Sequence, residues 1–451
     1  MVSDQPRELP SLAPGPAPAD METVFQALYT NATAEYTRLF ETYGDIVRLE
    51  VGPLVTHLLF HPDHTKHVYV TAAEKYDKET YGNRRLRALT GAHGLLFAEG
   101  PMWQRQRRLT QSVLAKSEHE RFAQLTRAAI LSHAQTWFSQ ATPTGTIEVQ
   151  ELTARAMFAV VTRALISRDL SNEELTELRR ALTVLGQGPA KNPKPHPSAQ
   201  EPGDDEFRRA RAFMDGTILA AIHRRQKEPP QDDFLGLLLK DGADDGSAFT
   251  EQELLDQTKT MLVAGHDSVA HSLVFALYFL SMHPHWQECV REEGRRLSST
   301  EPLSVTAASM PQTEAVVMET MRLLPSIWSN ERRAIVDDVV DGWHIPRGST
   351  VVLSPYIVHR HPDFWERPTE FLPQRFLDSN PLSHRYAYFP FGGGHRICIG
   401  NNLAMVQLKV ALGTFLSQYR IELGKEFTYE FNHMVVLRFM HGLPLKLTPI
   451  G

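Results

Sequence analysis

The chain has 451 residues, of which 42% are hydrophobic and 22% are charged, with a formal net charge of −6. This composition is ordinary for a water-soluble globular protein of sufficient length for a large core, and the acidic balance gives no support for nucleic-acid binding. The two cysteines, Cys289 and Cys398, cannot form a disulfide framework, and they suit a reducing cytoplasm.

The N-terminal 20 residues are rich in proline and alanine and lack an apolar core behind a basic segment. We therefore expect residues 1–20 to be a flexible leader, and neither a signal peptide nor a membrane anchor. One later run, 261–280, resembles a membrane span. It contains His266, Asp267 and His271, and a charged side chain at mid-bilayer is costly, so a buried helix in a water-soluble core is the better interpretation.

Two short strands are predicted at 46–51 and 56–60, on either side of Gly52-Pro53. Helical periodicity then dominates the first half of the chain. It covers the segments 62–70, 103–140, 148–168, 171–185 and 206–227. Residues 186–205 contain five prolines and interrupt this pattern. They predict a lid or long loop, with a disordered linker between domains as the open alternative.

The longest helix is predicted over 250–282, because Thr250-Glu251-Gln252-Glu253 is a capping box and His283-Pro284 ends the pattern. Another helix precedes Pro325, and a last long helix follows Gly400. Strand-like runs surround Gly342 and Gly348, and a β-rich tail begins near Phe427. The predicted fold class is mainly α with a small β portion.

The most informative segment is 390–400, which fits the pattern Phe391-x-x-Gly394-x-Arg396-x-Cys398-x-Gly400. A tight turn supplies backbone N–H donors, and the positive end of a following helix also favours a thiolate. A cysteine in such a turn is more often structural when it stands alone. A phosphate-binding loop is rejected, because the segment has no preceding strand pattern and no Lys-Ser/Thr pair.

This pattern resembles the haem-ligand loop of the haem-thiolate monooxygenases, the cytochrome P-450 family. The resemblance implies that the Cys398 thiolate ligates the iron of haem b, that Phe391 packs beside the sulfur, and that Gly394 and Gly400 permit a close turn. It runs from residue 21 to the C-terminus. It therefore implies a cytochrome P-450 fold, with a single haem-thiolate domain over 21–451.

A second match lies at Glu319-Thr320-Met321-Arg322, where an acid and a base share one face of a helix. Alone, such a pair is usually a solvated surface bridge. Its setting resembles the family's ExxR helix, and 371–376 resembles the segment whose arginine completes that buried network. The resemblance implies that Glu319, Arg322 and Arg375 hold the cysteine loop, although Gln374 replaces the common glutamate.

Ala264-Gly265-His266-Asp267-Ser268 resembles the family's oxygen-binding motif on the long helix. Small residues leave space above the iron, and an acid with a hydroxyl relays protons to bound dioxygen. The resemblance thus implies catalytic roles for Asp267 and Ser268. Ser268 stands where threonine is usual, so it keeps the hydroxyl but lacks the methyl group that limits its rotamers.

The haem propionates require cations and donors. Trp103 and Arg107 lie one helical turn apart and resemble the family's Trp-x-x-x-Arg pattern, which implies that both reach one propionate. Arg396 is the second expected contact. Arg332 is the third, with the adjacent Arg333 as its alternative.

Mostly apolar segments are expected to line a substrate pocket, which favours a terpenoid, fatty-acid or polyketide-like substrate. The predicted lining residues are Leu96, Val263, Ala264, Ile327 and Val436. The expected reaction inserts one oxygen atom from O2 into that substrate.

No flavin or iron–sulfur motif follows the cysteine loop, so electrons from NAD(P)H are expected through a ferredoxin reductase and a ferredoxin. A basic docking surface for the acidic carrier is one interpretation of several cations near the cysteine side, and a merely solvated face is the other. These cations are Arg105, Arg108, His384, Arg385 and Lys409.

Two other functions stay open. One is a haem enzyme that uses peroxide or rearranges its substrate, against which the Asp267-Ser268 pair speaks. The other is a haem-binding or gas-sensing protein without catalysis, against which the apolar pocket segments speak.

Overall fold

The computed structural model describes residues 11–139, 145–166, 172–187, 205–229, 233–240, 248–298, 302–378, 382–433 and 435–450. Residues 1–10 of the predicted leader and nearly all of the predicted lid lie outside these ranges. The chain forms two compact units, and each is described by itself. The sheet unit is Met1–Asn83, Arg322–Phe371 and Ser379–Cys398; the helical unit is Arg84–Met321, Leu372–Asp378 and Ile399–Gly451.

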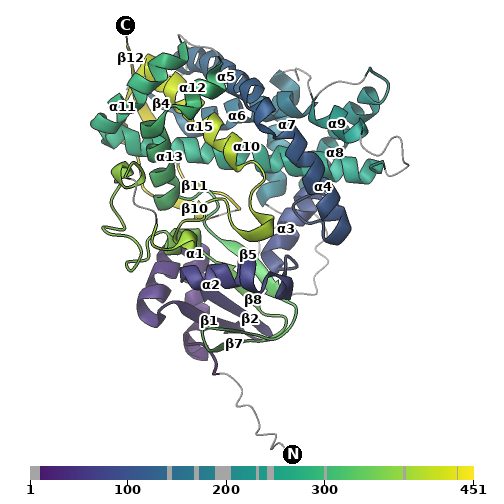
Figure 1. Cartoon of the computed structure of the whole chain (residues 1–451), viewed down its shortest axis with the longest axis vertical. Coiled ribbons are helices and arrows are strands. Elements are labelled where there is room, and N and C mark those ends of the chain that lie inside the picture. The colour runs from purple at the N-terminus through teal and green to yellow at the C-terminus, as the bar shows by residue number, and fades with distance from the viewer. Residues whose placement is uncertain are drawn as a thin grey trace, which may run out of the picture. The chain divides into compact units, whose positions relative to one another are not determined.

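The sheet unit is built on a five-stranded sheet in the order β1-β2-β8-β5-β3 (Figure 1). Its strands are β1 (Ile46–Val51), β2 (Leu54–Leu59), β3 (Tyr76–Asp77), β5 (Asn330–Ala334) and β8 (Thr350–Leu353). The predicted hairpin is confirmed: β1 and β2 pair antiparallel, with Gly52 at a φ of 55° in the turn. A second hairpin joins β6 (Asp338–Val340) to β7 (Trp343–Ile345).

Short helical elements surround this sheet and complete its core. They are α1 (Met21–Tyr43), α2 (Pro62–Lys66), the π-helical turn η2 (His67–Thr71), α14 (Pro355–Val358) and the 3-10 turns η7 (Arg385–Ala387) and η8 (Gly394–Arg396). Leu59, Val351 and Leu353 are fully buried among them, together with Phe389 from the segment that leads to the cysteine loop. Helix α1 was not predicted, because its sequence mixes polar and apolar residues with little periodicity.

The helical unit contains the long helices that the periodicity predicts. They are α4 (Gly100–Val113), α5 (His119–Ser139), α6 (Val149–Ile166), α7 (Asn172–Gln187), α8 (Asp205–Arg225), α10 (Glu251–Met282) and α15 (Asn401–Gln418). Shorter helices are α9 (Phe234–Lys240), α11 (Pro284–Arg295) and α12 (Leu303–Ala308). Two helices contain the boundary between the units, α3 (Tyr81–Thr90) and α13 (Pro311–Leu323).

Helix α10 is the central element of the helical unit and packs along α6, with α15 also beside it (Figure 1). Its capping box is present: the Thr250 hydroxyl accepts from the N–H of Glu253, and the Glu253 carboxylate accepts from the N–H of Thr250. Apolar side chains such as Leu273, Val274 and Phe275 are buried along its C-terminal half. Burial therefore holds this helix in place along its length.

The C-terminal part of the helical unit forms two small sheets, which confirms the predicted β-rich tail. One has the order β4-β12-β9, from β4 (Thr146–Glu148), β9 (Tyr419–Leu423) and β12 (Pro444–Pro449). The other pairs β10 (Phe431–His433) with β11 (Leu437–Phe439). The single helix predicted over 103–140 was wrong in one respect, because Leu114–Glu118 separates α4 from α5.

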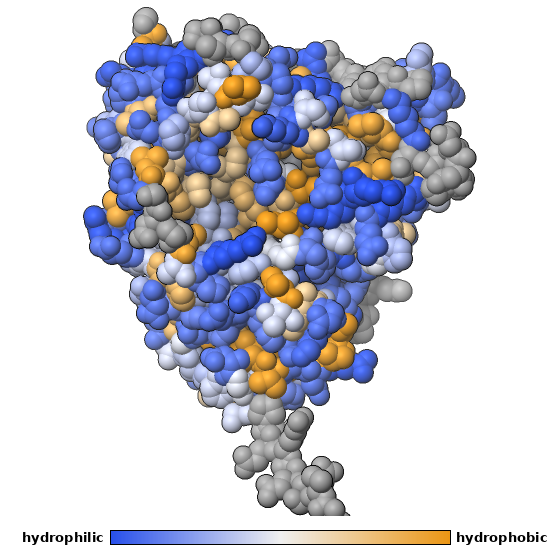
Figure 2. All heavy atoms as spheres, in the orientation of Figure 1, coloured by the Kyte–Doolittle hydropathy of each residue, from blue (hydrophilic) through white to orange (hydrophobic). Residues whose placement is uncertain are grey.

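Among the described residues, α10 alone has the length and composition of a membrane span, and 67% of its most apolar window is buried within the protein. That burial agrees with the core helix predicted from its charges. On the face shown in Figure 2, hydrophobic residues lie in small groups among hydrophilic ones, which is normal for a globular surface.

Candidate functional site

Three backbone hydrogen bonds close the cysteine loop in the sheet unit. The N–H of Cys398 donates to the carbonyl of Phe391 over 2.9 Å, and the N–H of Gly392 donates to that of Phe389 over 2.9 Å. A third bond runs from Ile397 to Gly394 over 3.2 Å. The loop is thus a fixed structure, although the side chain of Cys398 at its end is exposed.

Gly394 is required by the path of this loop. Its φ is 62°, and a Cβ placed there would lie 2.0 Å from the carbonyl oxygen of Tyr69 in η2. Gly400 differs, because its φ is −93° and no heavy atom surrounds an ideal Cβ within 4 Å. Of the two glycines expected to permit the close turn, only Gly394 therefore stands where a side chain would clash with its surroundings.

Arg322 holds the backbone behind this loop. Its buried guanidinium donates to the carbonyls of His359 at 2.9 Å, Pro368 at 2.7 Å and Glu370 at 3.0 Å. The Nε2 of the fully buried His359 in turn accepts a 2.9 Å hydrogen bond from the N–H of Phe389. Arg322 and His359 thus form a relay of hydrogen bonds that ends at the first residues of the cysteine loop. No local sequence pattern predicted this role of His359.

Glu319 and Arg375 pair within the helical unit. The Nε of Arg375 lies 3.2 Å from Oε1 of Glu319, and the same oxygen accepts from the N–H of Leu372 over 2.8 Å. Glu319 is fully buried at the end of α13. This ion pair holds the segment that carries Arg375. That Glu319 and Arg375 form one network with Arg322 stays a prediction.

Between Leu254 and Leu280, the least covered stretch of α10 is 263–268. Residues on both sides of it are buried, but Ala264 is exposed, and Val263, Asp267 and Ser268 are half-buried. The hydroxyl of Ser268 lies 3.2 Å from the carbonyl oxygen of Ala264, one turn earlier. The small residues of the predicted oxygen-binding motif therefore leave space on the helix face that carries the Ser268 hydroxyl.

Asp267 lies among basic groups. Burial alone raises the pKa of its carboxyl, but His271, His266 and Arg438 of β11 outweigh burial and hold the pKa below its usual value. Nδ1 of His271 is 3.2 Å from Oδ1 of Asp267. Burial lowers the pKa of His266, whose Nδ1 lies 2.7 Å from the carbonyl of Leu262. Asp267 is thus ionised at neutral pH.

The residues expected at the propionates occupy both units. In α4, the guanidinium of Arg107 lies over the ring of Trp103, 5.6 Å from its centroid. In the sheet unit, Arg332 lies over Tyr69 at 5.3 Å, whereas Arg333 pairs with Asp77. Of these two arginines, Arg333 is therefore paired with a carboxylate, whereas the guanidinium of Arg332 donates to the backbone carbonyl of Glu331. Phe391 and Arg396 are half-buried in the cysteine loop.

The segment 89–97, which was predicted to line the pocket, is held against α10 by hydrogen bonds. Both the N–H and Nδ1 of His93 lie 3.0 Å from Oδ2 of Asp256, and Leu95 donates its N–H to Gln257 over 2.7 Å. Gly91 and Gly94 permit this approach, because a Cβ at either position would overlap atoms of α10. Of the predicted lining residues, Leu96, Val263 and Ile327 are half-buried, Ala264 is exposed and Val436 is buried.

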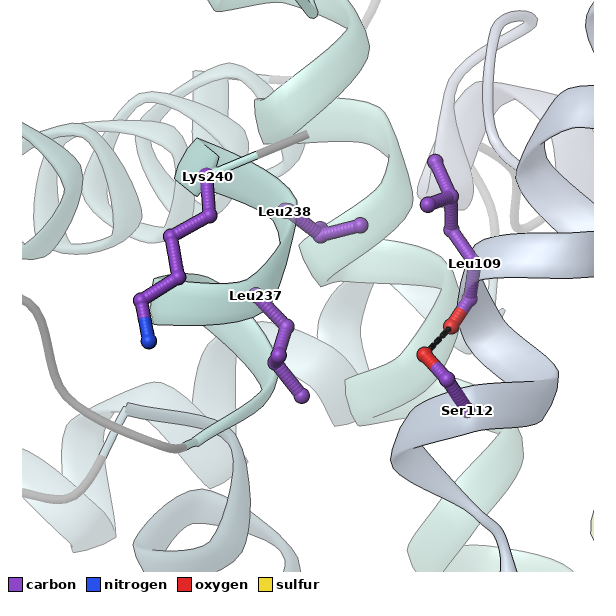
Figure 3. Close-up of a pocket in the computed structure, with 5 residues that line it drawn as sticks. All are labelled: Leu109, Ser112, Leu237, Leu238 and Lys240. Atoms are coloured by element: carbon purple, nitrogen blue, oxygen red, sulfur yellow. Dashed lines mark hydrogen bonds between the residues drawn. The ribbon is translucent and has the colours of Figure 1, made fainter. Parts of the chain in front are cut away.

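A pocket of about 270 Å³ lies elsewhere in the helical unit, between α4 and α9 (Figure 3). Leu109 and Ser112 line one side, and Leu237, Leu238 and Lys240 the other. The Ser112 hydroxyl donates a 2.7 Å hydrogen bond to the carbonyl of Leu109. The pocket therefore offers few directed polar groups, and none of the predicted site residues lines it.

Asp45, His61 and His361 form a cluster in the sheet unit whose ligand atoms lie within 4.8 Å of one another. Nδ1 of His61 accepts from the N–H of Asp63, and Nδ1 of His361 accepts from that of Asp363. In the neutral rings the proton is therefore on Nε2, and that of His361 points to Asp45 at 3.0 Å. This tautomer makes the contact between His361 and Asp45 a hydrogen bond, and the Nδ1 lone pairs of both rings are already used by backbone N–H groups.

The cations of the predicted docking surface are engaged in several ways. Lys409 is buried and its Nζ lies 2.7 Å from Glu314, so this residue is not part of an exposed basic face. Arg105 stacks over Phe249 at 4.0 Å, and His384 lies 3.1 Å from Asp63. These contacts weaken the docking interpretation relative to the alternative of a solvated basic face.

The family assignment rests on most of the chain. Residues 14–440 match the family described as Cytochrome P450. The chain belongs to the cytochrome P-450 family. It is 30% identical over 387 residues, 84% of each chain, to pentalenene oxygenase of Streptomyces avermitilis. It is also 27% identical over 425 residues to cyclooctatin synthase of Streptomyces melanosporofaciens, covering 91% of this chain and 90% of that protein.

Solved structures confirm the cytochrome P-450 fold. The haem domain of cytochrome P450DA aligns over 98% of each chain with a TM-score of 0.86 and 21% identity. Retinoic acid-bound cyanobacterial CYP120A1 aligns with a TM-score of 0.84 and 22% identity, over 98% of this chain and all of that one. The expected family, the mainly helical fold and the monooxygenase class are thus confirmed.

The family implies haem, and features of each unit fit this group. In the sheet unit, the loop is held by backbone bonds while the Cys398 thiol at its end is exposed, although free cysteine is among the most buried residue types. In the helical unit, a largely buried helix is uncovered around Ala264. A thiol donor and an open apolar helix face are the two surfaces that a thiolate-bound haem requires.

Proposed function

We propose that this cytochrome P-450 inserts one oxygen atom from O2 into a terpenoid or a similar hydrophobic small molecule. Support comes from two relatives whose names refer to pentalenene and cyclooctatin chemistry. The apolar character of Leu96, Val263 and Ile327 agrees with such a substrate. Fatty-acid and polyketide-like substrates remain the alternatives within the same class.

Cys398 is proposed as the residue whose thiolate would ligate the iron of haem b, with Phe391 beside its sulfur. Haem bound through a thiolate supplies the activation of O2. The fixed backbone of the loop, closed by the bond from Cys398 to Phe391, keeps the ligand in one orientation. This combination of a held loop and an accessible thiol is the observation that carries the proposal.

The haem propionates are proposed to be bound through hydrogen bonds, most of them charge-assisted. The donors would be Arg107 together with Trp103, then Arg396, and Arg332. Glu319, Arg322 and Arg375 are proposed as the structural network. Their buried charges are paired or hydrogen-bonded, and Arg322 reaches the cysteine loop through His359.

Asp267 and Ser268 are proposed to move protons toward bound oxygen. The Ser268 hydroxyl lies on the uncovered face of α10. Arg438 and the neighbouring histidines keep the Asp267 carboxyl ionised. A hydroxyl that both accepts and donates, next to a carboxylate, provides the two ends of a short proton path.

Electrons are proposed to come from NAD(P)H through a ferredoxin reductase and a ferredoxin, in the cytoplasm. The chain passes repeatedly between the sheet unit and the helical unit, which supports their proposed folding as one domain over 21–451. The predicted lid, 186–205, lies almost entirely outside the described residues and stays a prediction.

The first experiment tests the ligand. The reduced, carbon monoxide-bound protein is expected to show the thiolate-shifted Soret band, and Cys398→Ser to lose it while keeping its helical content. A histidine-type Soret band in freshly prepared wild-type protein would contradict the assignment of Cys398.

The second experiment tests the substrate class. Sesquiterpene and diterpene hydrocarbons are expected to shift the ferric haem toward high spin, and to give oxygenated products with ferredoxin, its reductase and NAD(P)H. Turnover with peroxide but none with the electron-transfer proteins would favour the peroxide-using alternative. No spin-state response to any hydrophobic ligand would favour the haem-binding protein without catalysis.

A further inference from the structure

His271 is bonded to the acid of the proposed proton path. It lies one helical turn after Asp267 on α10 and is buried, with 4% of its side chain exposed against 33% for Asp267. Its Nδ1 lies 2.8 Å from the backbone oxygen of Asp267 and 3.2 Å from the carboxylate oxygen Oδ1. Both neighbours are acceptors, so Nδ1 carries the hydrogen and the imidazole donates to Asp267.

The other charged groups near Asp267 do not have this geometry. Arg438 of β11 and His266 act on its carboxyl through charge, and Arg179 of α7 acts in turn on His266. His266 is turned to the carbonyl of Leu262 and lies edge-on to Phe158 of α6. Of these groups, His271 is therefore the one whose ring nitrogen lies within hydrogen-bond distance of both the backbone oxygen and the carboxylate of Asp267.

This bond has a mechanical consequence. An aspartate on a helix has a small number of χ1 and χ2 orientations, and a donor one turn later selects the one in which the carboxylate lies near that donor. The orientation of Asp267 relative to Ser268 then depends on a residue that reaches neither oxygen nor substrate.

We propose that His271 is the positioning residue of the proton path: through its Nδ1–H it fixes the Asp267 carboxylate, as an anion, in the orientation from which protons are passed. This inference rests on the proposed function of Asp267 and Ser268. It involves no transfer from His271 itself, whose N–H bond stays intact.

Two substitutions of His271 distinguish the role of its Nδ1–H donor from that of its imidazole ring. In His271→Asn the amide nitrogen takes the position of Nδ1 and retains the donor, whereas in His271→Gln the amide nitrogen takes the position of Nε2 and loses it. We expect the fraction of NAD(P)H electrons recovered in product to fall about three- to tenfold in His271→Gln, the range of one ordinary hydrogen bond, and to stay near the wild-type value in His271→Asn. Equal coupling in wild type and His271→Gln would overturn the proposal.

A spectroscopic titration provides a readout apart from turnover. The infrared carboxyl signal of Asp267, identified by its loss in Asp267→Asn, is expected to appear at higher pH in His271→Gln than in wild type or His271→Asn. The sign follows because the hydrogen bond stabilises the ionised form. The same titration midpoint in all three proteins would contradict the proposal.

Failure to fold is checked independently. Each variant is first required to show the wild-type thiolate-type spectrum. If His271→Gln does not, nitrogen NMR of the carbon monoxide-bound protein replaces it: the Nδ1 resonance of His271 is expected to shift in Asp267→Asn, and an unchanged resonance would overturn the proposal. Loss of the thiolate spectrum in wild type would instead refute the proposed function.

Discussion

Nδ1 of His93 lies 3.0 Å from Oδ2 of Asp256, and the backbone N–H of His93 donates to the same oxygen. The other carboxylate oxygen of Asp256 accepts from Gln252 over 2.8 Å and lies 3.3 Å from the buried ammonium of Lys259. One buried carboxylate of α10 therefore holds the predicted pocket segment 89–97 in place and also pairs with a buried cation.

Asp256→Ala is expected to lower the free energy of unfolding by about 3 kcal/mol or more, because it removes these acceptors and deprives Lys259 of one of its two carboxylates. Urea unfolding measures the loss, and hydrogen exchange is expected to accelerate in the amides of 92–97. His93→Ala is the matched control, since it removes only the ring bond and is expected to cost about 1 kcal/mol. Equal losses in the two variants would show that Asp256 does not anchor the segment.

A second prediction concerns the buried pair of Glu319 and Arg375. Glu319→Ala leaves the guanidinium without its carboxylate and the N–H of Leu372 without its acceptor, so we expect a loss of about 3–5 kcal/mol in unfolding free energy. Haem retention in gel filtration is expected to fall with it.

The control for this variant is Glu177→Ala. It removes an exposed carboxylate 3.6 Å from the exposed Arg180 on α7, and is expected to change stability by less than about 0.5 kcal/mol. A loss in Glu319→Ala as small as in this control would contradict a structural role for the pair.

Sequence alone predicts the parts of the site that are local in the chain. The helix around Asp267 follows from a capping box, a stop and continuous apolar periodicity, and burial confirms it. The cysteine loop was predicted from its local sequence pattern, and the positive φ of Gly394 agrees with a glycine at that position. Such features are predictable because neighbours in sequence determine them.

The supports of the site were not predictable in this way. His359 accepts from the N–H of Phe389, 30 residues later, and Asp256 binds His93, 163 residues earlier. Neither histidine stands in a local pattern that distinguishes it from the other histidines of the chain. The prediction that Lys409 lies on an exposed basic face was wrong for a related reason. A lysine on a helix is expected at the surface, but packing of α15 buries this one beside Glu314.

Gly394→Ala tests whether the loop depends on the left-handed backbone conformation. The new Cβ would lie 2.0 Å from the carbonyl oxygen of Tyr69, and the φ of 62° adds strain of about 1 kcal/mol. We expect the variant to lose most of its thiolate-type spectrum and to unfold at lower temperature. Gly400→Ala is the control, because its backbone is ordinary and its surroundings are open. Similar behaviour of the two variants would refute the steric argument.

The last prediction concerns His57, which lies in β2 directly opposite Arg48 of β1. Its side chain is fully buried, and neither ring nitrogen has a hydrogen-bond partner among the described residues. Burial, followed by the nearby Arg48 and His344, lowers the pKa of His57 from 6.5 to about 4. The folded protein therefore holds this ring neutral at a pH where the unfolded chain already protonates it.

The sign of the pH effect follows from this difference. Above pH 6.5, His57 is neutral in both the folded and the unfolded state, and its contribution to stability is fully present. As the pH falls from about 6.5 to about 4, the unfolded state takes up the proton first, so the free energy of unfolding falls. The loss is up to about 3 kcal/mol, at about 1.4 kcal/mol per pKa unit. Both His57→Leu and His57→Gln are expected to remove this share of the acid sensitivity, as measured by urea unfolding between pH 4 and pH 8.

The two variants are expected to differ at pH 8. His57→Leu replaces two unpartnered nitrogens with an apolar side chain and should raise stability by about 1–2 kcal/mol, whereas His57→Gln keeps a polar group in the same place and should not. A wild-type slope of stability against pH in both variants would show that His57 does not titrate in this range. Destabilisation by leucine at pH 8 would show instead that the imidazole packs or bonds better than its buried, unpartnered nitrogens indicate.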